Sequence, residues 1–560
     1  MIQRNWFQEY PSGMPKDVNY SAFPSVVALM EDSFARYGEA SAYCLGPKSL
    51  NYAALDHLSR DLAAFFQSKG LQRNDRVAVM LPNLLHYPVT IAAVLRAGLI
   101  AVNVNPLYTP RELEHQLRDS GAKAIVMFAP IHAVMANTLD SIFESVGLST
   151  VVLADASDAL THCALPEEGA ADHEGPMTFD AALAFGRLAK WERPLLEPED
   201  IAVLQYTGGT TGVSKGASLS HRALVANVLS SEVWLQPGLQ RRQITGQMNI
   251  VCALPLYHVF AFVSCALLGM RTGAQVLLVP NARDLSGTIA LLRPHKIHVI
   301  PAVNTLFNGL SSHPDFGTLD FSELCVSNGG GTAVMPAVAQ RWLALTGCPI
   351  VEGYGLSETA SGVTCNRADS DAFTGTIGLP MPGVDVRIID EQDVDVAVGL
   401  PGEIAIRGPQ LMSGYWGRPD ETAQVMTRDG YLKSGDVGVI DERGYIRIVD
   451  RKKDLVLVSG FNVYPSEIEA VVSSHPQVAD CAAVGVPDSD TGEAVHLFVV
   501  PRDPRLTLDD LRAFCAQQLT GYKRPKYIEI RQELPKTPVG KVLRRELRAE
   551  VTARNAPSQA

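Results

Sequence analysis

The sequence predicts an α/β protein with a large N-terminal domain of α/β subdomains plus a β-rich region, followed by a small α+β C-terminal domain. Three observations predict this architecture. A chain of 560 residues exceeds what one hydrophobic core usually serves. Strand-like and helix-like patterns alternate from Arg76 onward. A charged run at residues 450–454 then separates a strand-rich region from a shorter final block, so we expect domains at 1–450 and 451–560.

The first region has the pattern of a parallel sheet. The strand-like segment RVAVMLPN begins at Arg76 and is followed by the helix-like HYPVTIAAVLRAG and the strand-like LIAVNVNP. A second round follows in PRELEHQLRDSGAKAIVMF. Strands that alternate with helices predict a parallel sheet with helices on its faces. Further along, VDVRIID, GEIAIRG and YIRIVD predict the strands of the β-rich region.

Composition excludes several classes of function. The chain has 48 Lys plus Arg against 60 Asp plus Glu, a net charge of -12, which makes nucleic acid an unexpected partner. Its nine cysteines are dispersed, without a CxxC pair, which predicts reduced thiols in a cytoplasmic protein. The apolar run at residues 259–270 is only twelve residues long, so we expect a buried helix and not a membrane span.

The strongest local signal is YTGGTTGVSKG at residues 206–216. It follows the strand-like IAVLQ and precedes the helix-like HRALVANVLSS. Glycines let backbone amides approach an anion, while hydroxyl groups and Lys215 add donors and positive charge. The segment matches neither the GxxxxGK[ST] loop nor a GxGxxG fingerprint. It therefore predicts a phosphate-binding loop of another kind.

Five further motifs follow this loop in a fixed order: LPLYHVFAF (254–262), EGYGLSET (352–359), SGD (434–436), DRKKD (450–454) and PKTPVGKVLRREL (535–547). Together they resemble the core motifs of the adenylate-forming superfamily. The resemblance to bacterial long-chain fatty-acid CoA ligases is closer still, from VNVNPLYTPRELEHQL at Val102 to VSGFNVYPSEIE at Val458. This resemblance implies ATP, Mg²⁺ and CoA as cofactor and co-substrates, a fatty acid as substrate, and an acyl-adenylate intermediate.

The resemblance also implies where ATP binds. Lys215 and the loop would hold the pyrophosphate end, and Thr207 and Glu358 would place Mg²⁺, a hard cation that prefers oxygen ligands. Tyr354 would stack on adenine opposite a glycine stretch, and Asp436 and Arg451 would bind the ribose. The expected ATP/AMP site is Thr207, Gly208, Gly209, Thr210, Thr211, Gly212, Lys215, Gly329, Gly330, Gly331, Tyr354, Gly355, Glu358, Asp436 and Arg451.

Lys541, His258, Thr207 and Glu358 are the expected catalytic residues. Lys541 lies in a Gly-containing turn and would steady the α-phosphate and carboxylate oxygens. His258 would orient the acid without acting as a general base, since a fatty acid is already ionised at neutral pH. The two half-reactions need different site shapes, so the C-terminal domain is expected to be mobile and to turn about a hinge at Lys453.

The resemblance is less specific about the surfaces that bind the acyl chain and CoA. An alkyl chain requires an apolar channel, for which the resemblance offers Tyr257, Phe260, Phe262, Val303 and Phe307. The family often has Trp at the position of Phe262, so the acyl length remains open. For CoA the candidates are Gly460, Phe461, Lys523, Arg524 and Lys526.

Other functions remain compatible with the same motifs. A medium-chain or aryl acid:CoA ligase and a fatty acyl-AMP ligase would share them, and a catalytically silent acyl- or nucleotide-binding homologue is the non-enzyme alternative. The last would typically lack one of the charged residues that the chemistry needs, and all of them are present here. Peripheral contact with the inner face of the membrane and a homodimer are compatible with the sequence, which predicts neither.

Overall fold

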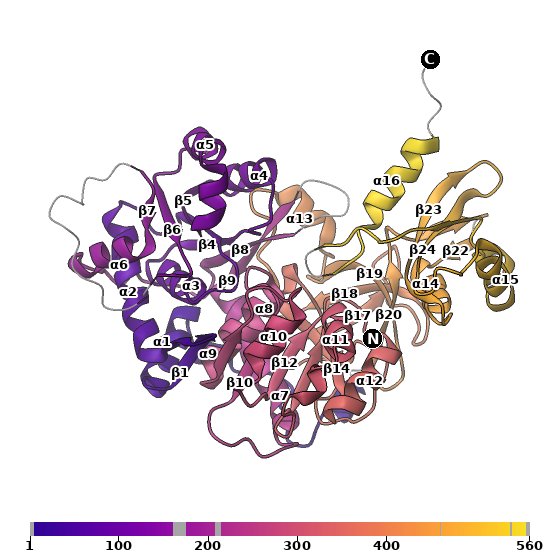
Figure 1. The fold of residues 1–560 in the computed structure, drawn as a ribbon, viewed down its shortest axis with the longest axis horizontal. Coiled ribbons are helices and arrows are strands. Elements are labelled where there is room, and N and C mark those ends of the chain that lie inside the picture. The colour runs from indigo at the N-terminus through magenta and orange to yellow at the C-terminus, as the bar shows by residue number, and fades with distance from the viewer. Residues whose placement is uncertain are drawn as a thin grey trace.

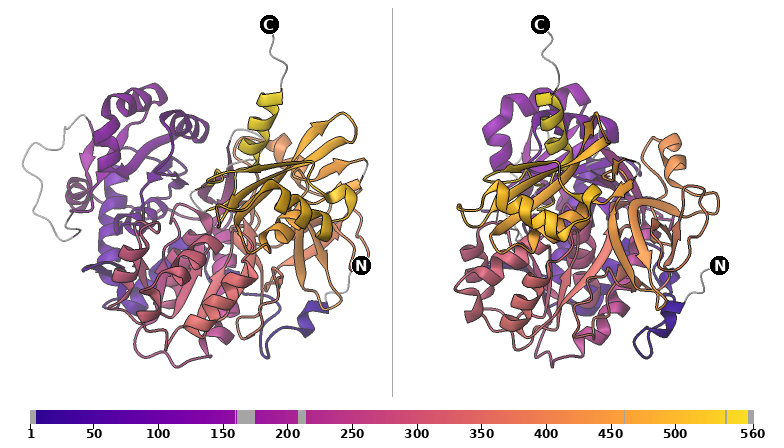
Figure 2. Two further views of the ribbon diagram at one scale, coloured as in Figure 1. Left: turned by 45° about the vertical axis from the view of Figure 1, so that its right-hand side comes forward. Right: turned by 90° about the vertical axis from the view of Figure 1, so that its right-hand side faces the viewer.

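The computed structural model describes residues 5–158, 160, 175–207, 214–459, 461–537 and 540–555. The chain forms a mixed α/β fold with a large N-terminal domain and a small C-terminal domain (Figure 1). In both views of Figure 2 the C-terminal domain, in yellow, packs against the rest of the molecule. Among the helices of the described residues, none combines the length and the hydropathy needed to cross a membrane.

A seven-stranded sheet forms the first layer of the N-terminal domain. Its strands are parallel except for the last pair, β8 and β9, which is antiparallel. Their order is β7 (Met177–Thr178), β6 (Thr150–Ala154), β5 (Ala122–Phe128), β3 (Arg76–Met80), β4 (Ile100–Asn103), β8 (Ile201–Thr207) and β9 (Lys215–Ser220). The predicted strand–helix–strand rounds are confirmed, because α3 (His86–Arg96) and α4 (Pro110–Ser120) connect β3, β4 and β5.

A nine-stranded sheet forms the second layer, with parallel central strands and antiparallel edges. Its order is β16 (Leu379–Pro380), β15 (Ser361–Cys365), β14 (Ile350–Leu356), β13 (Val326–Gly329), β12 (Val299–Ala302), β10 (Asn249–Cys252), β11 (Gln275–Leu278), β1 (Ser41–Leu45) and β2 (Lys48–Asn51). One continuous cluster of buried apolar side chains packs against both large sheets, which fixes the carboxyl ends of their strands relative to each other.

Helices cover the faces of these two sheets. They are α1 (Val26–Tyr37), α2 (Tyr52–Ser68), α5 (Ala129–Val146), α6 (Phe179–Leu188), α7 (His221–Leu239), α8 (Val259–Ala261), α9 (Leu268–Thr272), α10 (Leu285–Leu292), α11 (Asn304–Ser312) and α12 (Pro336–Thr346). The apolar run at 259–270 is buried and helical as expected, with a wider π-helical stretch at Phe262–Leu267. α4 begins at a capping box, in which Thr109 and Glu112 bond to each other's backbone amides.

The β-rich region is an antiparallel four-stranded sheet of β17 (Asp385–Ile389), β18 (Gly402–Arg407), β19 (Leu432–Ile440) and β20 (Ile446–Arg451). The short helix α13 (Pro419–Val425) precedes β19. From β20 the chain continues into β21 (Val456–Val458), which belongs to a different sheet. The predicted domain boundary between residues 450 and 451 therefore falls next to this change of sheet, although the boundary itself stays a prediction.

The C-terminal domain has its own five-stranded sheet, made of β22 (Phe461–Val463), β21, β24 (Gly492–Pro501), β23 (Val478–Asp488) and β25 (Tyr527–Ile530). Three helices accompany it, α14 (Pro465–Ser473), α15 (Leu508–Gln518) and α16 (Arg544–Asn555). Its two apolar clusters are made only of residues from 456 to 551. A separate core lets this domain pack as a unit, which the expected rotation about Lys453 would require.

Candidate functional site

Thr207 and Lys215 face each other at the mouth of the β8–β9 hairpin. Thr207 is the last residue of β8 and pairs with Lys215, the first residue of β9. The Lys215 ammonium forms an ion pair with Glu421 and lies 5.2 Å from the centre of the Tyr415 ring. Gly208, Gly209, Thr210, Thr211 and Gly212 lie outside the described residues. The strand β9 was not foreseen between the loop and the helix that follows it.

Glu358 accepts a hydrogen bond from the same tyrosine. The Tyr415 hydroxyl donates to Oε1 of Glu358 over 2.7 Å, and the amide of Met412 donates to the Glu358 carbonyl over 2.8 Å. Burial, followed by the Glu358 charge, raises the pKa of Tyr415 far above its usual value, so the hydroxyl stays protonated and remains a donor. Tyr415 thus links Lys215 and Glu358, and the sequence analysis missed it.

A glycine stretch, residues 329–331, lies at the end of β13. A Cβ atom on Gly330 would lie 3.0 Å from the Phe260 ring, and one on Gly331 would lie 3.4 Å from Val303. Gly331 also has φ of +75°, a backbone conformation that favours glycine. Side chains at these positions would crowd Phe260 and Val303, so glycine is required here, and the contact with a planar base stays a prediction.

Glu352 supports this stretch and was not predicted. Its Oε1 accepts a hydrogen bond of 2.8 Å from the amide of Val334, while Oε2 has no hydrogen-bond partner. Burial raises the pKa of the Glu352 carboxyl to about 7. Glu352 is the first residue of the EGYGLSET motif, which was the signal for it in the sequence. Its side chain, however, contacts Val334, eighteen positions earlier in the chain.

Tyr354, Asp436 and Arg451 form a short chain of polar contacts. The Tyr354 hydroxyl donates to Oδ2 of Asp436 over 2.6 Å, and Nε of Arg451 lies 3.0 Å from Oδ1. Asp436 and Arg451 are direct neighbours on β19 and β20. Asp436 is 3% exposed, and both of its oxygens have a partner. The structure therefore brings together the three residues predicted to bind adenine and ribose, while their roles stay predictions.

Lys541 lies on a tight turn of the C-terminal domain that contacts the N-terminal domain. The Thr537 amide donates to the Lys541 carbonyl over 2.8 Å, and Gly540 has φ of +79°. A Cβ atom on Gly540 would lie 2.5 Å from Oγ1 of Thr305, a residue of α11. Only a glycine therefore permits this close approach between the two domains.

The Lys541 ammonium lies in a strongly charged environment. Burial, followed by the Arg451 charge, lowers its pKa to about 8, and the Asp436 charge acts in the opposite direction. Burial and Arg451 also lower the pKa of Lys453, the predicted hinge residue. Arg451, Lys453 and Lys541 thus lie around Asp436. This excess of positive charge suits a site for an anion that carries more than one negative charge.

His258 is the residue that precedes α8. Burial, followed by the nearby Lys541 charge, lowers the pKa of His258 to about 4, so the ring is neutral at pH 7. Nδ1 accepts a hydrogen bond of 3.4 Å from the Phe260 amide. A neutral ring that accepts at Nδ1 carries its proton on Nε2, which leaves Nε2 as a donor. This arrangement fits an orienting role and not a general base.

The residues predicted to line the acyl channel differ in how deeply they are buried. Phe262 and Phe307 are fully buried, and Phe307 packs edge-on against Trp342 with ring centres 4.7 Å apart. Tyr257 and Phe260 are partly exposed, and burial raises the pKa of Tyr257 to about 12. Phe260, Val303 and Phe307 surround the glycine stretch. Their contact with an acyl chain stays a prediction.

Phe461 is exposed on the C-terminal domain, where it stacks on Tyr522 with ring centres 4.8 Å apart. The Lys523 ammonium pairs with Glu467 at 2.7 Å. Lys526 pairs with Asp488, and the Arg524 side chain bonds to backbone carbonyls of α15 and the residue after it. Gly460 lies outside the described residues. CoA binding by this surface stays a prediction, and Tyr522 is an unforeseen part of it.

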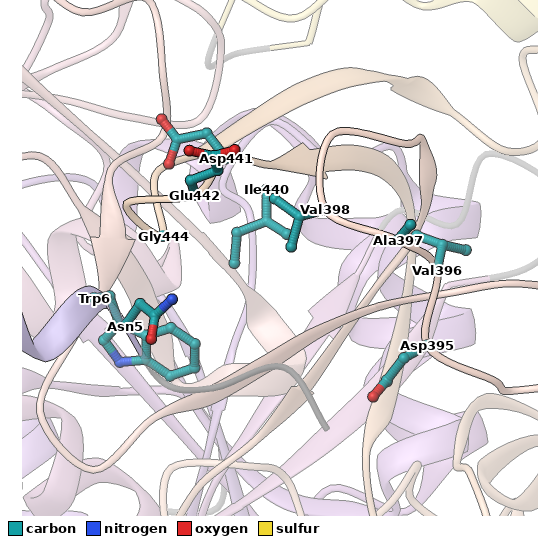
Figure 3. Close-up of a pocket in the computed structure, with 10 residues that line it drawn as sticks. All are labelled: Asn5, Trp6, Asp395, Val396, Ala397, Val398, Ile440, Asp441, Glu442 and Gly444. Atoms are coloured by element: carbon teal, nitrogen blue, oxygen red, sulfur yellow. The ribbon is translucent and has the colours of Figure 1, made fainter.

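A pocket of about 560 Å³ lies elsewhere, between the N-terminal segment and the β-rich region (Figure 3). Its lining includes Trp6, Val396, Ile440 and Glu442. None of the predicted site residues contributes to its lining.

The predicted metal ligands fit Mg²⁺ better than a transition metal. Within the described ranges, no group of three or more His, Cys, Asp or Glu side chains could hold a metal ion. Thr207 and Glu358 instead supply one hydroxyl and one carboxylate. Mg²⁺ is commonly bound by one or two carboxylates together with substrate phosphates and water, so this sparse oxygen set is suitable.

Comparison with known proteins gives consistent results. The model of the family described as AMP-binding enzyme matches residues 30–416, and that of the AMP-binding enzyme C-terminal domain matches residues 467–541. The chain is 46% identical to a long-chain-fatty-acid--CoA ligase of Escherichia coli O157:H7 and 45% identical to one of Salmonella typhimurium, over 98% of both chains in each case. Among solved structures it resembles ATP-bound MatB from Rhodopseudomonas palustris, with a TM-score of 0.81 and 27% identity over 94% of this chain and 99% of that chain.

Proposed function

Because the chain belongs to the AMP-binding enzyme family, we propose that it is an ATP-dependent long-chain fatty acid:CoA ligase. The observation that carries this proposal is the 46% identity, over 98% of both chains, to a long-chain-fatty-acid--CoA ligase. The geometry supports it, because Asp436, Arg451 and Lys541 come together although they belong to different domains. The substrates are a fatty acid, ATP and CoA, and the products are acyl-CoA, AMP and pyrophosphate.

In the first half-reaction a fatty-acid carboxylate oxygen attacks the α-phosphorus of ATP. A new P–O bond forms, the bond to the β-phosphate oxygen breaks, and pyrophosphate leaves with its electron pair. Negative charge concentrates on the α-phosphate oxygens, where the Lys541 ammonium would stabilise it. Nε2 of His258 would donate to the acid and hold its oxygen in line.

The nucleotide would be held by groups from three different sheets. Tyr354 and the backbone at residues 329–331 would bind adenine between them. Asp436 would accept hydrogen bonds from the ribose hydroxyls and Arg451 would donate to the same sugar. Lys215 would bind the β- and γ-phosphates. Mg²⁺, held by Thr207 and Glu358, would neutralise phosphate charge when bound.

In the second half-reaction the CoA sulfur attacks the acyl carbonyl carbon. The C–S bond forms, the C–O bond to the phosphate breaks, AMP leaves with that electron pair, and the thiol proton is released to solvent. In the present arrangement Lys541 lies near Asp436 and His258, so the thiol would need the segment around Lys541 to withdraw. We infer that the C-terminal domain rotates about Lys453 between the two steps, and the separate core of this domain supports that inference.

The test is pyrophosphate and AMP release with saturated acids of two to eighteen carbons, with and without CoA. We expect CoA-dependent turnover that is fastest with long chains. A maximum with medium-chain or aromatic acids would assign the chain to a related ligase, and adenylate without thioester would make it an acyl-AMP ligase. Absence of turnover with every acid would refute an enzymatic function.

The place of action is part of the same proposal. A cytoplasmic enzyme that contacts the inner face of the membrane peripherally would meet long-chain acids where they partition. Sedimentation with liposomes tests this contact. Analytical ultracentrifugation tests a homodimer, for which the described residues offer no specific argument.

A further inference from the structure

Glu421 neutralises the charge of Lys215, the lysine that the proposed function assigns to the ATP phosphates. It lies in the first turn of α13 and forms an ion pair with the Lys215 ammonium. Lys215 begins β9 and lies 206 positions before Glu421 in sequence, so the pair exists only because the segment before α13 packs along β9. The amides of Ser218 and Trp416 bond between these segments over 2.9 and 2.8 Å.

Further ion pairs hold Glu421 in place from its other side. Nη1 of Arg418 lies 3.0 Å from Oε1 of Glu421, and Nη2 lies 2.8 Å from Oδ1 of Asp119 on α4. Asp119 also accepts a hydrogen bond of 2.7 Å from the Tyr206 hydroxyl, next to Thr207 at the end of β8. Charged contacts therefore connect the two strands that flank residues 208–213, through α4 and α13.

In this arrangement Lys215 can leave Glu421 for a phosphate at a small cost in free energy. If Lys215 moves toward a phosphate, Glu421 keeps Arg418 as a partner and is not left uncompensated. Lys215 and Glu421 are each 32% exposed, so solvent screens their attraction. Lys215, followed by Arg418, lowers the pKa of Glu421, so the carboxylate is ionised at neutral pH.

We propose that Glu421 competes with ATP for the Lys215 ammonium: it holds the ammonium at the mouth of the β8–β9 hairpin and releases it to the β- and γ-phosphates of ATP. Triphosphate binding then replaces one ion pair of Lys215 by another. The pair lowers the affinity for ATP, since it must be broken first, and it has no effect on AMP, which lacks the β- and γ-phosphates. This inference rests on the proposed function, which assigns Lys215 to those phosphates.

The test is equilibrium binding of ATP and of AMP, without fatty acid, to the full chain and its variants. Glu421→Gln keeps the size of the side chain and removes its charge. An exposed pair contributes up to about 1 kcal/mol, so we expect ATP to bind about two- to fivefold more tightly, with AMP unchanged. Asp420→Asn is the matched control, because Asp420 is an exposed carboxylate of the same helix turn.

A double-mutant cycle isolates the pair. In a Lys215→Ala background, Glu421→Gln should no longer change the affinity for ATP. Unchanged or weaker ATP binding by both Glu421→Gln and Glu421→Ala, in variants that melt at the wild-type temperature, would overturn the proposal. An equal shift for AMP, or for Asp420→Asn, would overturn it as well. Normal ATP binding without acyl-CoA synthesis would refute the proposed function and leave this inference to be judged by the binding data.

Discussion

The Tyr354 hydroxyl donates to Oδ2 of Asp436 over 2.6 Å, and this bond joins the nine-stranded sheet to the four-stranded sheet. The two residues are 82 positions apart in sequence. Burial, followed by the Asp436 charge, raises the pKa of Tyr354 well above its usual value, so the hydroxyl is a donor at every physiological pH. Asp436 is thereby oriented before any nucleotide arrives.

Tyr354→Phe should therefore reduce both stability and ATP binding. A lost hydrogen bond to a charged group costs about 1.5 to 3 kcal/mol, and we expect the free energy of unfolding in urea to fall by about this amount. The KM for ATP should rise. Tyr431→Phe is the matched control, because it removes a bond of 2.6 Å between Tyr431 and Asp385. It should reduce stability and leave the KM for ATP unchanged.

Lys541→Ala should stop acyl-adenylate formation while the variant still makes thioester from supplied acyl-AMP. The ammonium is needed only where charge develops on the α-phosphate. The measurement is pyrophosphate release in the first assay and acyl-CoA formation in the second. Lys536→Ala, on the same hairpin and paired with Asp480, should retain both activities. Equal loss of both half-reactions in Lys541→Ala would contradict this assignment.

The pH dependence of adenylation should report the same lysine. The pKa of Lys541 is lowered to about 8, so the required ammonium is present below this pH and is lost above it. We expect kcat/KM for ATP to fall as the pH rises through about 8. Lys541→Arg, if it is active, should not show this fall because a guanidinium stays protonated. Thioester formation from supplied acyl-AMP should lack it too.

Lys453→Pro should slow the thioester step more than adenylation. Proline restricts φ at the proposed hinge, whereas in the arrangement described here Lys541 already lies near Asp436 and Arg451, where adenylation is proposed to need it. An added barrier of about 1.4 kcal/mol would slow the second step tenfold. Single-turnover measurements of each half-reaction provide the test, with Lys453→Ala as the control that keeps φ free. Equal slowing of the two steps by Lys453→Pro would count against a hinge at this residue.

Gly355→Ala should destabilise the protein and weaken nucleotide binding. A Cβ atom at Gly355 would lie 1.9 Å from the Ser361 carbonyl oxygen, so the β14–β15 pair would have to open beside Tyr354. Such overpacking typically costs about 1 to 3 kcal/mol. Gly362→Ala is the control on the paired strand, where the nearest atom would be 3.5 Å away. A wild-type melting temperature for Gly355→Ala would contradict this expectation.

Local patterns in the sequence predicted much of the fold. The strand β3 and the helix α3 follow from their apolar periodicity, because a fully buried strand and its crossover helix leave a clear pattern. The strand β9 was missed because KGASLS has little strand character, and its pairing with β8 is what makes it a strand. The β8–β9 hairpin could therefore be identified only from the tertiary structure.

The sequence by itself determined which chemical groups are candidates for the site, because its motifs resemble those of a known family. Asp436 and Lys541 were predicted from this resemblance. Only the tertiary structure decided how these groups meet, since pairs such as Tyr415 with Glu358 and Lys215 with Glu421 are far apart in sequence. Their contacts depend on how the sheets pack against each other, and that packing is decided by burial throughout the whole core.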